Sequence, residues 1–62
     1  MTLQIRYQDG TLGEFVSAPR LKEVREKARA ILLRGLSAYA ELVDRGGKRV
    51  ALVFRDGHED RF

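Results

Sequence analysis

Large apolar and polar side chains alternate over residues 3–8. This period of two is typical of a half-buried strand. The Asp9-Gly10 dipeptide that follows suits a two-residue type I′ hairpin turn, in which both central residues take a positive φ. The pattern therefore predicts a first hairpin with strands at 3–8 and 11–16. The residues that this register places on one apolar face are Leu3, Ile5, Tyr7, Leu12 and Val16.

The apolar period lengthens to three and four residues in the next segment, which predicts an amphipathic helix over residues 18–34. We expect the Ser17 hydroxyl to cap the start of this helix, with Pro19 in its first turn. Gly35 can take the left-handed conformation that often follows a helix. The apolar stripe expected to pack on the first hairpin consists of Leu21, Val24, Ala28, Ile31 and Leu32.

Strands at 36–44 and 48–55, joined at Gly46-Gly47, form a second predicted hairpin, and both of its faces are apolar. A sheet surface that meets water should be polar, so one face is expected to join the core and the other to meet a partner. We assign the bulkier face to the core because it supplies more volume. That face contains Tyr39, Val43, Val50, Leu52 and Phe54. The face left outside, as a protein interface, contains Ala38, Ala40, Leu42, Ala51 and Val53.

Together these elements predict a single α+β domain over residues 1–62, with a ββαββ order. One amphipathic helix covers one face of a four-stranded, mainly antiparallel sheet. The strand order 2-1-3-4 makes every neighbouring pair antiparallel and is preferred. The order 1-2-3-4 needs a parallel pair and a right-handed crossover. A second Asp-Gly dipeptide at Asp56-Gly57 would also let residues 58–62 fold back as a fifth strand.

The amino-acid composition limits the kinds of stabilising and binding site that the chain can form. A 62-residue domain buries only about 60% of the surface that its unfolded chain exposes. The chain has no Cys and one His, which excludes disulfides, thiolate sites and multi-His zinc sites. Stability must then come from packing or self-association. The first residues lack the apolar run of a signal peptide, and the longest apolar stretch, Val50 to Phe54, is too short to span a membrane. We therefore expect a cytoplasmic protein.

Catalysis is not expected, because no nucleophile lies near a base and an orienting group. Ser17 is explained as a helix cap, Ser37 lies at a strand start, and the only histidine, His58, lies in the tail. His58 and Asp60, with Asp56 nearby, offer an incomplete set of metal ligands, and a solvated acidic end is the better interpretation. No cofactor, metal or small-molecule substrate is inferred.

Two functions remain, and neither is enzymatic. The first is a protein-binding module that self-associates, since the second hairpin has one apolar face too many. The alternative is a small nucleic-acid-binding protein, because 12 basic and 9 acidic residues give a net charge of +3. Against it, the sequence shows no aromatic stacking set on a polar sheet face. The candidate phosphate contacts are Lys22, Arg25 and Arg29 on the helix, and Arg45, Lys48 and Arg49 at the second turn.

Overall fold

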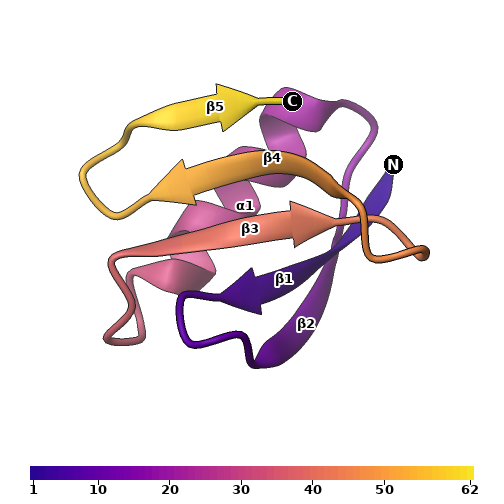
Figure 1. Ribbon diagram of the computed structural model, residues 1–62. Helices are drawn as coiled ribbons and strands as arrows, with labels where there is room; N and C mark the ends of the chain where they lie inside the picture. The colour runs from indigo at the N-terminus through magenta and orange to yellow at the C-terminus, as the bar shows by residue number, and fades with distance from the viewer.

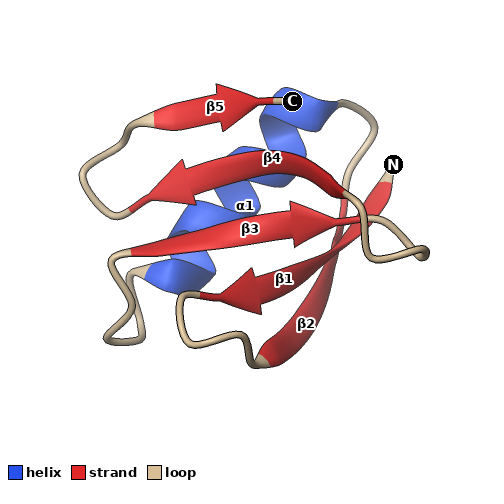
Figure 2. Cartoon of the chain, in the orientation of Figure 1, coloured by secondary structure: helices blue, strands red, loops and turns tan.

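The computed structural model describes residues 1–62 as one antiparallel sheet with a single helix across one of its faces (Figures 1 and 2). The elements are β1 (Thr2–Tyr7), β2 (Leu12–Ser17), α1 (Leu21–Leu32), β3 (Tyr39–Val43), β4 (Arg49–Phe54) and β5 (Glu59–Arg61). The strands lie in the order β2-β1-β3-β4-β5. The small α+β class and the preferred order of the first four strands are confirmed. The count of four strands is wrong, because the tail pairs with β4 as a fifth.

The helix is shorter than predicted and begins differently. Its N-cap is Arg20, in an extended conformation, and no side chain caps it. The predicted cap, Ser17, instead ends β2, where its hydroxyl bonds Thr2 Oγ1 at 2.8 Å. The strand continues this far because Ala18 exchanges two backbone hydrogen bonds with Met1, at 3.0 and 2.7 Å. Pro19 therefore precedes the helix and does not occupy its first turn.

The end of the helix is held by a side chain from another element. Gly35 does not take the predicted left-handed conformation. The guanidinium of Arg55, which follows β4, donates to the carbonyls of Leu32, Leu33 and Gly35. A cation at a helix C-terminus also interacts favourably with the helix dipole. Arg55 thus supplies a donor to the Leu33 and Gly35 carbonyls and adds a second donor to the Leu32 carbonyl, which also accepts the Gly35 N–H at 3.1 Å.

All three hairpins turn in the same way, around three-residue loops that end in glycine. Gly10, Gly47 and Gly57 have φ values of +89°, +82° and +100°, a region that favours glycine. The predicted two-residue loops are therefore wrong. In each of the first two hairpins a bulge restores the expected register further along, as in Leu3↔Val16 and Tyr39↔Phe54.

In the first hairpin, one residue changes face as a result. The longer first loop places Leu12 opposite Arg6, on the side of the sheet away from the helix, where it is 57% exposed. The bulge then returns Val16 to the buried side. The Tyr7 ring packs over Gly13 at this bulge and leaves no room for a Cβ there.

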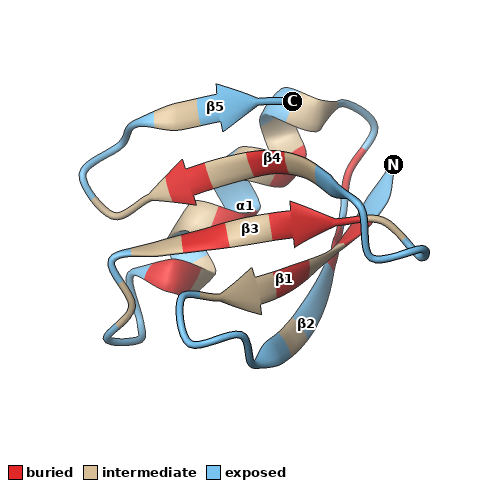
Figure 3. Ribbon diagram, in the orientation of Figure 1, coloured by how far each residue is buried: buried red, intermediate tan, exposed pale blue.

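The core lies between α1 and one face of the sheet, here named the helix-covered face (Figure 3). Val24, Ala28 and Leu32 of the helix are buried, and Leu21 and Ile31 pack partly buried beside them. The sheet and its flanks contribute Leu3, Ile5, Val16, Ala18, Ala40, Leu42, Ala51 and Val53.

The predicted assignment of the two faces of the second hairpin is wrong, except for Val50, which lies at the bulge in β4 and packs against the core as predicted. Ala40, Leu42, Ala51 and Val53 are fully buried beneath the helix, so they present no surface to a partner. Only Ala38, which precedes β3, is exposed. The reason is the pairing of β1 with β3, which sets Ile5 beside Leu42. This register fixes which set of alternate residues in β3, here called its parity, faces the helix. Small side chains on that parity also let the helix approach the sheet closely.

Candidate functional site

The face of the sheet opposite α1, here named the helix-free face, is uncovered by any other element (Figure 2). Strand pairing aligns its side chains in rows that run across the strands. The first row is Tyr39 and Phe54. The second row is Leu12, Arg6, Glu41, Leu52 and Asp60. The third row is Phe15, Gln4, Val43 and Arg49.

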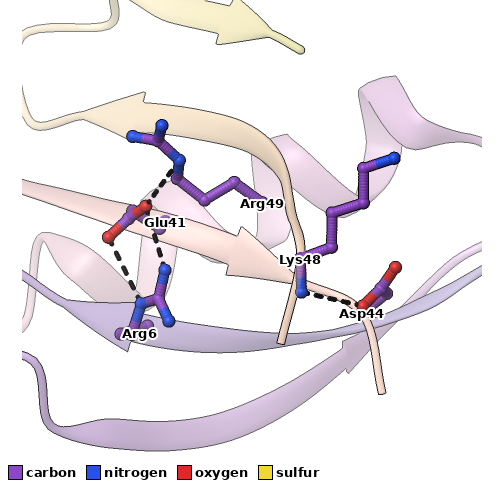
Figure 4. Close-up of polar contacts among 5 residues, drawn as sticks. All are labelled: Arg6, Glu41, Asp44, Lys48 and Arg49. Carbon is purple, nitrogen blue, oxygen red and sulfur yellow. Dashed lines mark hydrogen bonds and ion pairs between the residues drawn. The ribbon is translucent and has the colours of Figure 1, made fainter. Parts of the chain in front are cut away.

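A charge network lies at the centre of this face. Glu41 accepts two hydrogen bonds from Arg6, with Nε–Oε1 at 3.3 Å and Nη2–Oε2 at 3.2 Å. Arg49 approaches from the other side, with Nε 3.3 Å from Glu41 Oε2 (Figure 4). The Glu41 side chain is only 18% exposed, whereas that of Arg49 is 54% exposed. One carboxylate therefore binds two guanidinium groups. These three side chains alone carry one net positive charge.

Aromatic rings line the same face. The Tyr39 and Phe54 ring centroids are 5.7 Å apart, and those of Phe54 and His58 are 5.1 Å apart. The Arg49 guanidinium carbon lies 4.7 Å from the centroid of the Phe62 ring. The sequence prediction that no aromatic set occupies a sheet face with polar residues is therefore wrong, because the bulky parity of the second hairpin faces away from the helix.

A shallow hollow of about 470 Å³ lies at one end of the helix-free face. Its apolar lining comes from Phe15 and Val43, and Val43 is only 2% exposed. Its polar lining comes from Thr2, Gln4 and Arg45. Phe15 itself is 63% exposed, so a large apolar side chain stands at the edge of this hollow.

The basic residues of the helix are engaged within the fold. The Arg25 guanidinium lies 3.5 Å from Glu59 Oε1 and is only 15% exposed. Arg29 Nη2 donates to the Arg55 carbonyl at 3.1 Å. Both side chains tie the helix to β5 and to the loop before it. Lys22 alone of the predicted helical trio is exposed.

The second predicted basic cluster is divided. Arg45 and Lys48 are exposed at the β3–β4 turn, where Asp44 Oδ1 accepts the backbone N–H of Lys48 at 3.0 Å (Figure 4). Arg49 belongs to the Glu41 network and lies away from the turn on the helix-free face. The six basic candidates are therefore not gathered on one surface.

The tail residues do not converge on a common point. His58 Nε2 lies 3.2 Å from Asp60 Oδ2. Asp56 instead accepts the His58 backbone N–H at 2.9 Å. The one clear pKa shift is at Asp9, in the first turn, where the Thr11 N–H donates to the carboxylate and lowers its pKa.

Sequence reasoning missed the ion pair of Arg6 and Glu41. A signal was present in the pattern: Glu41 shares its parity with Tyr39 and Val43. Burying a carboxylate beneath a helix is costly, so this parity belongs on the side that meets water or a partner. Bulk alone was the wrong criterion for choosing the core face.

Comparisons of this chain with protein-family models, curated proteins and solved structures gave no match. The single helix has 12 residues and is neither long enough nor apolar enough to cross a membrane. The helix-free face is the most extensive surface on which a function can be based.

Proposed function

We propose that this protein is a non-enzymatic interaction module that binds protein, most simply a second copy of itself, through its helix-free face. The observation that supports this is the placement of bulky apolar side chains on a face that no element covers. Exposed apolar patches of this kind usually mark protein contacts. The members of that apolar set are Leu12 and Phe15, which are exposed, and Tyr39, Leu52 and Phe54, which are half-buried.

The charge of the face favours protein over nucleic acid. Its strands present two arginines, Arg6 and Arg49, and two carboxylates, Glu41 and Asp60. The formal charges cancel, and both guanidinium groups already bond Glu41. Phosphate binding depends on uncompensated positive charge, which this face lacks.

Nucleic-acid binding is the second candidate, and the aromatic rings favour it. Tyr39, Phe54 and His58 form a continuous row on which bases of a single strand could stack. Arg45 and Lys48 are exposed at the β3–β4 turn, at the opposite end of these strands, so a strand of nucleic acid would have to run along β3 and β4 to reach both the rings and these charges.

The test compares Leu52→Lys with the control Leu36→Lys. Leu52 lies on the helix-free face between Glu41 and Asp60, so the monomer tolerates a lysine there. Leu36 is fully exposed in the loop between α1 and β3 and is not part of the face. Light scattering across a dilution series should give a dimer mass for the unmodified protein and for Leu36→Lys, and a monomer mass for Leu52→Lys.

The same variant separates the two candidates. If the face binds single-stranded nucleic acid, Leu52→Lys adds a positive charge and should strengthen retention on single-stranded DNA at low salt. An unmodified protein that is monomeric at high micromolar concentration, and retained on DNA in a salt-sensitive way, would overturn the protein-binding proposal.

A further inference from the structure

The geometry points to one arrangement of two copies: they meet face to face across a two-fold axis parallel to the strands, between β1 and β3, so that Arg6 of each copy lies against the partner's Glu41. This inference rests on the proposed function, whose partner and register it specifies. It follows from the order of side chains in the rows of the helix-free face.

The second row fixes the order of charges across the sheet. From β2 to β5 it reads Leu12, Arg6, Glu41, Leu52 and Asp60. These residues are direct neighbours on adjacent antiparallel strands, about 4.8 Å apart. The row therefore reads apolar, positive, negative, apolar, negative.

Rotation about a two-fold axis parallel to the strands reverses the order of residues in each row. It leaves each row at the same height along the strands, so each row faces its own copy. With the axis between β1 and β3, the Arg6 guanidinium meets the partner's Glu41, and Leu12 meets the partner's Leu52. The four central charges then alternate in sign. The most exposed side chain of this row's apolar pair, Leu12, gains an apolar neighbour.

In the third row the same operation sets Phe15 against the partner's Arg49, and Gln4 against the partner's Val43. A guanidinium over an aromatic ring is a favourable contact. Phe15 is 63% exposed, and Arg49, which contacts Glu41 and the Phe62 ring within its own chain, still has 54% of its side chain exposed to meet a second ring.

Other positions of the axis fail. An axis along β3 sets Glu41 against its own copy, and an axis along β1 sets Arg6 against its own copy. An axis between β3 and β4 pairs Arg6 with the partner's Asp60 but sets Glu41 against the partner's Leu52, an apolar side chain. Like charges or unmatched groups brought together at an interface oppose binding. Only the axis between β1 and β3 sets both Arg6 and Glu41 against an opposite charge; it leaves Asp60 at the rim of the contact.

Exchanging the two central charges tests this register. The double variant Arg6→Glu with Glu41→Arg keeps an ion pair within the chain and rebuilds the pair across the interface, so it should form its own dimers. Mixed with the unmodified protein, it places like charges together. Native mass spectrometry with one partner isotope-labelled should show mixed dimers depleted about tenfold relative to the statistical half at low salt.

Cysteine cross-linking gives a second readout that does not depend on charge or on the folding of the swap variant. The chain has no native cysteine. Stacked sheets lie about 10 Å apart, too far for a direct disulfide, so a short bis-maleimide is the probe. Leu12→Cys and Leu52→Cys proteins should be linked into a dimer by it when mixed, and each alone should stay unlinked, because a cysteine and its own copy would lie three strand spacings apart across the sheet, about 14 Å.

The outcomes separate this inference from the proposed function. Mixed dimers at the statistical fraction, or a folded charge-swap variant that stays monomeric, would overturn the register while the face remains an interface. Equal cross-linking of each cysteine variant with itself would do the same. A monomeric unmodified protein removes self-association and this arrangement with it.

Discussion

The two faces of the sheet differ in the size of their side chains, and the difference runs against the simplest expectation. The helix-covered face presents Ala40 and Ala51 at its centre, whereas the helix-free face presents Tyr39 and Phe54. The largest fully buried side chains come from both layers, so the two alanines suffice to fill the space between them. These side chains are Leu32 and Val24 from the helix and Ile5, Leu42 and Val53 from the sheet. Close packing needs complementary volumes and not the largest ones. A bulky strand face is therefore not in itself a core face.

The largest expected effect is a difference between two leucines on opposite faces. Leu42 is fully buried, and Leu42→Ala should lower the free energy of unfolding by about 2–5 kcal/mol because it leaves a cavity. Leu52→Ala, on the helix-free face, should cost less than about 1 kcal/mol in the monomer. Urea denaturation of both variants at low concentration measures the difference. Equal losses would contradict the assignment of the faces.

A larger side chain on the helix-covered face should lower the free energy of unfolding by somewhat less than the cavity in Leu42→Ala. Ala51 is fully buried beneath the helix, so Ala51→Leu forces side chains into an occupied space and should lower the free energy of unfolding by about 1–3 kcal/mol. Ala38→Leu is the matched control, because Ala38 is exposed and its change should stay within about 0.5 kcal/mol. An Ala51→Leu protein that gained stability would show spare volume under the helix.

The attachment of the helix to the covered face depends partly on Arg55. Arg55→Met removes the donor to the last carbonyls of α1 and should cost about 1–2 kcal/mol. Arg34→Met is the control, since that side chain is 69% exposed and only approaches Glu14 at 3.7 Å. Thermal unfolding followed by circular dichroism compares the two variants. Arg55→Met should melt earlier, and equal melting temperatures would show that the cap contributes nothing.

The smallest effect concerns the first turn, whose length decides that Leu12 points away from the helix. The Thr11 N–H donates to Asp9 and lowers the pKa of that carboxyl below its usual value in the unfolded chain. The ionised form therefore contributes stability that is present above pH about 4 and lost as the pH falls through the folded pKa. Asp9→Asn keeps a side-chain acceptor without the charge.

The stability difference between the unmodified protein and Asp9→Asn should thus be greatest near neutral pH and shrink below pH about 4. Denaturation at several pH values measures it. Two curves that stay parallel over this range would show that the Asp9 charge has no role in the turn.

Patterns within a few residues predicted the helix and the strands. Contacts between distant segments decided which side of each strand faces the helix. Alternation and helical spacing located the first four strands and the helix, because each signal lies within a few residues. The register of β1 against β3 joins segments far apart in the chain, and nothing in either segment specifies it. This register decides which face of the second hairpin meets the helix, and the position of Glu41 was the one local signal that indicated that face.

Two further features illustrate the same limit. The three-residue loops and their compensating bulges differ from two-residue loops by one residue, which glycine content alone does not reveal. Arg55 caps a helix from which it is separated by two strands, and long side chains leave no spacing pattern for such a contact. The candidate network of Arg6 and Glu41 also crosses 35 residues of chain.

The pairing of β1 with β3 has a consequence for how the domain assembles. Every other strand pair joins neighbours along the chain through a short turn, whereas this seam joins segments separated by β2 and the helix (Figure 1). Closing a long loop costs more chain entropy than closing a hairpin, and slow folding steps are usually those that form distant contacts. We therefore expect the hairpins to form early and the seam to close in the rate-limiting step. The amide protons that bond β1 to β3 should then exchange with solvent only when the whole domain unfolds.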